Sequence, residues 1–188
     1  MDEPRTAVPP VTDALREQAA QQPGSWLFAI DPHFDPNGKV PPYGVVGAWK
    51  VDDRGHLTGE FQHNPKYRPS PRARGMKDPT DPVDAVIQLA ATGYASDTDV
   101  QSAILDSAVY VVPGSTSATA IHPQTDQPFV LAIYTSPLHA PSSVPEVQRT
   151  HFRDLLGTLP ELGSLKVNPH GSVSVEIPLA DLRRAAGQ

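Results

Sequence analysis

Apolar residues recur at helical spacing in several parts of the chain. The clearest predicted helix begins at Asp81-Pro82, where a capping acid precedes a proline at the first helical position. Apolar residues that share one face of this helix follow before Gly93: Val83, Val86, Ile87, Ala90 and Ala91. The same criteria predict further helices from Thr12 or Asp13 to Pro23, from Ser96 or Asp97 through Ile104, around residues 152–159, and after Pro178.

Short apolar runs predict the strands. Residues 26–30, 109–112 and 129–134 are hydrophobic throughout, which is typical of strands that are buried on both faces. Weaker alternation on both sides of the turn residues 52–55 predicts a hairpin over residues 44–61. A second hairpin is expected over residues 164–177, around the turn Pro169-His170-Gly171.

The order of these elements predicts an α+β protein. Helices and strands are interleaved, and we expect a mixed or antiparallel β-sheet covered by helices. The 22 prolines concentrate in connections such as residues 31–43, 64–79 and 113–128, which predicts long ordered loops. A length of 188 residues fits one domain, so we predict a flexible segment over residues 1–10 and a single domain over residues 11–188.

Composition excludes several classes of protein. The chain has no Cys, which excludes disulfide scaffolds, thiolate metal sites and Cys nucleophiles. Lys and Arg total 15 against 21 Asp and Glu, and this net charge of -6 argues against general nucleic-acid binding. No apolar run is long enough to span a bilayer, so we expect no membrane insertion. The first residues include no basic leader, which favours a cytoplasmic protein.

The sequence contains no complete catalytic or metal-binding motif. The patterns of nucleophile elbows, phosphate loops and dinucleotide-binding loops are absent from the sequence. Asp31, His33 and Asp35 alternate as metal ligands can, but Pro32 and Pro36 prevent them from sharing one face of a strand. Asp-Pro pairs are also ordinary turn starts. We therefore predict neither an enzyme nor a bound metal or cofactor.

One segment differs in charge from the rest of this acidic chain. Residues 66–77, here called the basic segment, contain five of the 15 Lys and Arg residues and no acid. Guanidinium groups beside a tyrosine on an irregular backbone can bind a phosphate, a carboxylate or an acidic partner. The alternative is that the arginines pair with acids of the same chain and only hold the loop in place. The candidate binding residues are Lys66, Tyr67, Arg68, Arg72 and Arg74.

Residues 97–183 resemble the SseB N-terminal domain family. The most specific elements of this resemblance are Tyr134-Thr135-Ser136, after a predicted strand, and the turn Val167-Asn168-Pro169. The N-terminal half is similar to an actinobacterial group described as type VII secretion system-associated proteins. Its matching stretches include residues 23–27, 31–36, 40–47 and 67–72.

The resemblance implies an α+β module without established catalytic residues. It favours a non-enzymatic cytoplasmic adaptor or chaperone-like accessory protein that binds a component or substrate of a type VII-like secretion system. The alternative is a regulatory module that binds a small molecule or phosphate through the basic segment. The sequence indicates neither the identity of the partner nor the oligomeric state.

Overall fold

The computed structural model describes residues 8–115, 129–144 and 146–187. Contacts divide the chain into two compact units, Met1–Gly75 and Met76–Gln188, which are called unit 1 and unit 2 below. The boundary falls within the proline-rich stretch 64–79. Most of the predicted flexible N-terminal segment and of the predicted loop 113–128 lies outside the described residues. The single-domain prediction for residues 11–188 stays a prediction.

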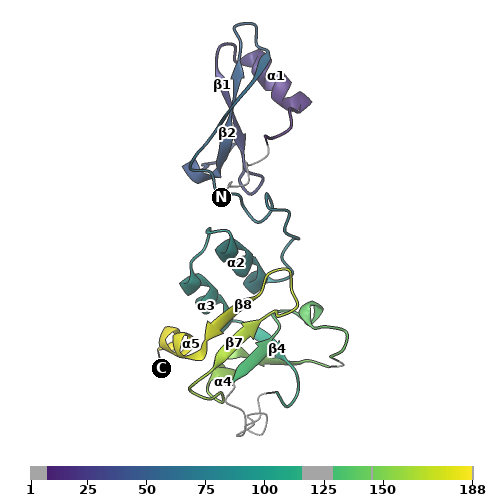
Figure 1. The fold of residues 1–188 in the computed structure, drawn as a ribbon, viewed down its shortest axis with the longest axis vertical. Coiled ribbons are helices and arrows are strands. Elements are labelled where there is room, and N and C mark those ends of the chain that lie inside the picture. Colours follow the sequence, from purple (N-terminus) through teal and green to yellow (C-terminus); the bar gives the residue numbers. More distant parts are fainter. Residues whose placement is uncertain (1–7, 116–128, 145, 188) are drawn as a thin grey trace, which may run out of the picture. The chain divides into compact units, whose positions relative to one another are not determined.

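Unit 1 consists of one helix and one antiparallel sheet (Figure 1). Helix α1 (Asp13–Gln21) begins where Thr12 accepts a hydrogen bond from the Leu15 amide. The strands pair in the order β1-β2-β3, and the hairpin of β2 and β3 confirms the predicted turn. Their bounds are β1 (Trp26–Ile30), β2 (Val45–Val51) and β3 (Leu57–His63), with a short 3-10 helix η1 (Pro42–Gly44) before β2.

The helix of unit 1 covers only one face of its sheet. Leu27 and Val51 pack with Ala19 of α1 in the buried cluster of this unit. On the opposite face, Trp26 is 38% exposed and Phe28 is 66% exposed. The prediction that residues 26–30 are buried on both faces is therefore wrong. A continuous apolar run shows that a strand is hydrophobic, but it does not show whether other elements of the fold cover one face of the strand or both.

Unit 2 packs helices on a mixed sheet (Figure 1). Strand β5 (Val130–Ile133) runs parallel to β7 (Ser164–Val167), and β7 is antiparallel to β8 (Val175–Pro178). Strand β4 (Ala108–Val111) pairs with β6 (Gln148–His151), and a bridge between Tyr110 and Tyr134 links this pair to the end of β5. The helices are α2 (Pro82–Ala91), α3 (Asp97–Leu105), α4 (Phe152–Leu156), α5 (Leu179–Ala186) and the 3-10 helix η3 (Pro137–His139).

The core of unit 2 lies between this sheet and its helices. Ile104, Leu131, Phe152, Leu165 and Leu182 are all almost completely buried within one cluster. Burial alternates along β4 and β5, and Val130 remains 47% exposed, so the prediction that these strands are covered on both faces is also wrong. The predicted α+β class, with mixed and antiparallel pairing, is confirmed. No helix in the described ranges is long and apolar enough to cross a membrane.

Candidate binding surfaces

The carboxylate of Asp31 is the anchor of the basic segment. Asp31 directly follows β1 and is completely buried. Its oxygens accept hydrogen bonds from the Tyr67 hydroxyl at 2.7 Å and from the Ser70 amide at 3.0 Å, and also from the Ser70 hydroxyl. The His33 amide donates a fourth bond at 2.9 Å. A single carboxylate therefore joins the end of β1 to a loop almost forty residues further along the chain.

These hydrogen bonds determine the charge state of Asp31. Burial raises the pKa of a carboxyl group because it disfavours the charged form. In Asp31 the hydrogen bonds from Ser70, His33 and Tyr67 outweigh burial and lower the pKa below its ordinary value. The carboxylate is therefore ionised at neutral pH. A buried ion that is fully hydrogen-bonded holds its donors in defined positions.

The basic side chains themselves remain at the surface. Lys66, Arg68, Arg72 and Arg74 are all exposed. The Arg68 guanidinium lies 5.8 Å from the centre of the Tyr43 ring, a cation–π contact. Lys66, Arg72 and Arg74 form no ion pair with any carboxylate in the part of the chain that the structure describes. Hydroxyl and amide groups, rather than Arg72 and Arg74, thus fix the loop in place.

Tyr67 differs from the other candidate residues because its hydroxyl is used within the fold. Backbone bonds fix the same stretch: the Arg68 amide donates to the Tyr43 carbonyl at 3.0 Å, and the Arg74 amide donates to the Ser70 carbonyl at 2.9 Å. The turn over residues 70–75 therefore has a defined backbone that presents two arginines. A binding role for Tyr67 stays a prediction, and its observed contact is structural.

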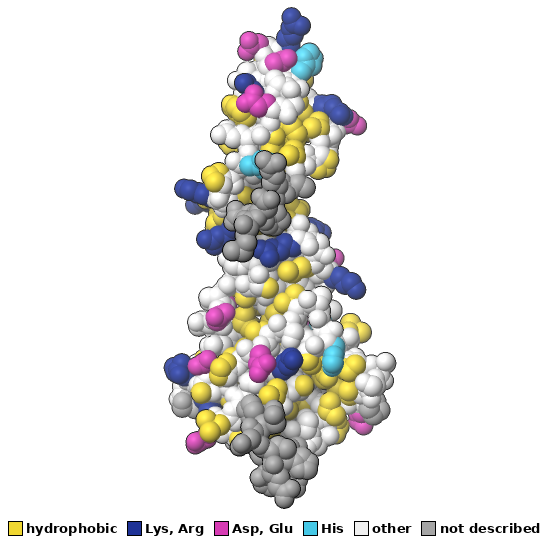
Figure 2. All heavy atoms as spheres, in the orientation of Figure 1, with side chains coloured by type: hydrophobic (Ala, Val, Ile, Leu, Met, Phe, Trp, Pro, Cys, Tyr) yellow, Lys and Arg dark blue, Asp and Glu magenta, His cyan; other side chains and the backbone are white. Residues whose placement is uncertain are grey.

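A shallow groove lies beside the start of the basic segment. Its volume is about 350 Å³, and the residues that line it include Phe28, Pro42, Val45 and Pro65. The Asn64 side chain fixes its shape by donating to the carbonyls of Pro42 and Val45, at 2.7 Å each. Figure 2 shows apolar side chains at the surface of this unit with Lys and Arg among them. We call these residues the unit-1 groove.

The pattern Asp31-x-His33-x-Asp35 does not form a metal site. Asp31 accepts the four hydrogen bonds described above, and Asp35 accepts a bond from the Asn37 amide at 2.9 Å within its own turn. Within the described residues, no three His, Asp or Glu side chains are grouped as metal ligands would be. Both acids begin turns, as Asp-Pro sequences commonly do.

The two most specific elements of the family resemblance meet in unit 2. The Thr135 amide donates to Asn168 Oδ1 and Asn168 Nδ2 donates to Thr135 Oγ1, both at 2.9 Å. Asn168 is completely buried and has a φ of 50°, in the left-handed region that asparagine tolerates better than most residues. The pair connects the ends of the parallel strands β5 and β7. Its geometry indicates a structural role.

The Thr135 hydroxyl continues this network toward a histidine. It donates to Asp81 Oδ2 at 2.7 Å, and the Thr80 hydroxyl lies 2.8 Å from His139 Nε2. Asp81 and Asp84 carboxylate oxygens lie 3.9 Å and 3.8 Å from the same nitrogen. A catalytic triad needs the carboxylate and the hydroxyl on opposite nitrogens of the ring. Here the Thr80 hydroxyl and the carboxylates of Asp81 and Asp84 all lie near Nε2 of His139. The cluster therefore caps α2 and does not have the geometry of a triad.

Comparisons with protein-family models, with curated proteins and with solved structures give no match. The resemblance to the SseB N-terminal domain family and to type VII secretion system-associated proteins therefore stays a prediction. The anchoring role of Asp31 was not predicted from the sequence, in which Asp31-Pro32 is typical of a turn start. The available signal was an acid placed directly after an apolar strand, where a buried carboxylate needs a partner.

Proposed function

We propose that this protein is a non-enzymatic, cytoplasmic adaptor or chaperone-like accessory protein of a type VII-like secretion system, and that unit 1 binds an acidic segment of a partner protein. The link to secretion comes from the family resemblance alone. The observation that carries the binding proposal is the presentation of Arg72 and Arg74 on a loop that Asp31 fixes through other groups. These cations contribute no described ion pair to the fold.

The surroundings of the basic segment favour an acidic partner that also carries apolar side chains. The unit-1 groove lies next to Lys66, and the exposed faces of Phe28 and Tyr43 offer apolar area beside the charges. A loop that is already ordered loses little conformational freedom on binding, which favours affinity. Arginine forks bind carboxylates in two-point contacts. An acidic peptide with an aromatic or aliphatic anchor meets both requirements.

A second candidate is a regulatory site for phosphate or a phosphorylated small molecule. It is favoured by the backbone of residues 70–75, in which the Gly75 amide donates to the Arg72 carbonyl at 3.0 Å. Arg72 and Arg74 both lie on this turn, whose backbone is fixed by hydrogen bonds. Two guanidinium groups at such a turn match the charge of one phosphate.

The proposal is tested by recovery of partners from the native host. The variant Arg72→Ala/Arg74→Ala removes two cations and none of the hydrogen bonds that anchor the loop. The matched control Lys39→Ala/Arg54→Ala removes two exposed cations elsewhere in unit 1. We expect salt-sensitive loss of the partner, identified by mass spectrometry, only in the first variant, with an unchanged melting temperature in both.

Two results distinguish the candidates. Partner recovery that is equal in the wild-type protein and in Arg72→Ala/Arg74→Ala contradicts an adaptor that uses this segment. The second candidate instead predicts that inorganic phosphate raises the melting temperature of the wild-type protein but not that of the variant. A melting temperature several degrees lower in Arg72→Ala/Arg74→Ala, with normal recovery, means that the arginines support the fold and do not bind a partner.

A further inference from the structure

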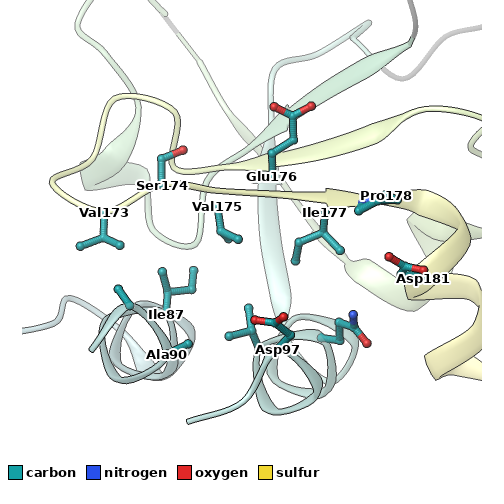
Figure 3. A pocket seen from close by; sticks show the side chains of 13 residues that line it. Ile87, Ala90, Asp97, Val173, Ser174, Val175, Glu176, Ile177, Pro178 and Asp181 are labelled. Carbon is teal, nitrogen blue, oxygen red and sulfur yellow. The ribbon is translucent and has the colours of Figure 1, made fainter. Parts of the chain in front are cut away.

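A second groove lies in unit 2, between strand β8 and helices α2 and α3. Its volume is about 330 Å³. Figure 3 shows Val173 and Val175 pointing from the β8 segment toward the helix of Ile87 and Ala90, and Ile177 pointing toward the helix that begins at Asp97. The walls are thus aliphatic on both sides. The proposed function in unit 1 makes no use of this groove.

The outer edge of β8 is unpaired as far as the described residues show. β8 is the last strand in the order β5-β7-β8, and no strand in the described part of the chain lies on its other side. The Leu179 amide donates to the Gly163 carbonyl at 3.0 Å, which fixes the alternation of hydrogen bonds along the antiparallel pair. By this alternation Ile177 bonds to Leu165, whereas the N–H and C=O of Glu176 point away from β7.

The position of Pro178 agrees with this alternation. Pro178 has no N–H and lies opposite Ser164. At this position of the antiparallel pair an N–H would point away from β7, so the proline breaks no hydrogen bond between β7 and β8. Glu176 therefore supplies the N–H that the free edge of β8 can donate beside the groove. An unpaired N–H and C=O next to an aliphatic groove are the features that bind an extended peptide as an added strand.

The charged residues around the groove are all acidic. Asp97, Glu176 and Asp181 belong to its lining, and the lining contains no Lys, Arg or His. The carboxylate of Glu176 points away from the helices (Figure 3), so Asp97 and Asp181 are the acids on the groove side. Asp181 pairs with Arg184 at 3.0 Å, and Glu176 accepts a bond from the Ser164 hydroxyl. Asp97 is exposed and has no ion pair within the described residues. A cationic side chain is therefore the complement of this end of the groove.

We propose that unit 2 binds an extended segment of a partner protein, which adds as a strand to the edge of β8. Its backbone pairs with the N–H and C=O of Glu176. Valine- or isoleucine-like side chains at alternate positions enter the groove, and a lysine or arginine lies near Asp97. This segment is basic, whereas the segment proposed for unit 1 is acidic. The two sites therefore bind different sequences, and each proposal can be contradicted without affecting the other.

The decisive experiment compares two substitutions at one position. Glu176→Ala and Glu176→Pro remove the same carboxylate, but only the proline also removes the outward N–H. The probe is the synthetic peptide acetyl-Lys-Thr-Val-Thr-Val-Thr-Val-amide, whose lysine and valines share one face of the extended chain, titrated into the full-length 15N-labelled protein and followed by amide NMR shifts. We expect shifts at residues 173–177 and 87–91, and a dissociation constant about three- to tenfold higher for Glu176→Pro than for Glu176→Ala.

The charge requirement is tested with a second matched pair. Asp97→Asn should weaken binding of the lysine peptide by about two- to fivefold, whereas Asp154→Asn, an exposed acid of α4, should leave it unchanged. The same peptide with glutamate in place of lysine should bind more weakly to the wild-type protein. Equal affinities for the two peptides overturn the charge assignment.

The proposal remains falsifiable if Glu176→Pro fails to fold. Successive N–H groups of an extended peptide point to opposite edges, so of two peptides, one N-methylated at its central valine and one at the threonine before it, one loses the N–H that faces β8 and should lose binding to the unaltered protein. Full binding of both N-methylated peptides, or shifts confined to residues outside the groove, overturns strand addition. Binding that survives Ala90→Phe, which fills the groove from α2, overturns the assignment of the aliphatic side chains.

Discussion

Replacing Asp31 should destabilise unit 1 strongly, although in the sequence Asp31 precedes a proline and has the pattern of an ordinary turn residue. In Asp31→Ala, the amides of His33 and Ser70 lose their acceptor, and so do the hydroxyls of Tyr67 and Ser70. The hydroxyls can rotate to other acceptors, but the direction of an amide N–H is fixed by the backbone. Ser70 is completely buried, so its N–H has no access to water.

The expected magnitude follows from these contacts. A buried donor that is left without an acceptor costs about 1–3 kcal/mol, and a hydrogen bond to a charged group contributes about 1.5–3 kcal/mol. Because the four bonds share one carboxylate, they are not additive, and we expect a total loss of about 3–5 kcal/mol in the free energy of unfolding. A domain of ordinary stability has about 5–15 kcal/mol in all.

Asp35→Ala is the matched control, because Asp35 also precedes a proline and accepts one amide bond, from Asn37, but lies at the surface. We expect it to cost about 1 kcal/mol or less. Urea denaturation followed by tryptophan fluorescence measures both variants. The chain has two tryptophans, Trp26 and Trp49, and both lie in unit 1, so the signal reports on this unit. Equal losses for Asp31→Ala and Asp35→Ala would refute the anchoring role.

Three further predictions concern pH, the buried asparagine and the domain boundary. Hydrogen bonding lowers the folded-state pKa of Asp31 below its ordinary value. The ionised carboxylate therefore contributes fully to the free energy of unfolding above the ordinary carboxyl pKa of about 4, and this contribution is lost as pH falls toward the folded-state pKa. In urea titrations, the stability difference between the wild-type protein and Asp31→Asn should shrink below about pH 4. Asn168→Ala should destabilise unit 2 by about 2–4 kcal/mol, measured by circular dichroism, because it leaves the Thr135 amide without its acceptor; a loss no larger than that of the exposed control Asp154→Ala contradicts this. A single domain over residues 11–188 predicts that limited trypsin treatment leaves no separately folded halves with ends near residue 75; two stable fragments in gel filtration contradict it.

Helix starts were predictable because their signals are local. Asp81 accepts bonds from the amides of Val83 and Asp84, and Ser96 forms a reciprocal capping box with Asp99. Both caps lie within three residues of the donors they satisfy, so a short window of sequence contains the whole motif. The strand Gln148–His151 was missed because its polar sequence has no apolar alternation. Its pairing with β4 is a long-range contact, which no local pattern records.

The candidate sites were predictable only in part for the same reason. The charge of residues 66–77 is visible in the sequence, and the structure leaves Arg72 and Arg74 exposed. Their anchoring depends on Asp31, which is far away in the chain. The groove beside β8 combines residues 87–101 with residues 173–181. Its unpaired edge follows from strand order, and hydropathy contains no information about strand order.

The proline at the end of β8 also bears on solubility. A free sheet edge can pair with the same edge of another molecule, and long flat edges of this kind promote aggregation at high protein concentration. Pro178 interrupts the row of donors after Glu176, so two copies that met edge to edge would form few continuous hydrogen bonds. A short edge of this kind therefore offers a second copy less continuous pairing than a longer edge would.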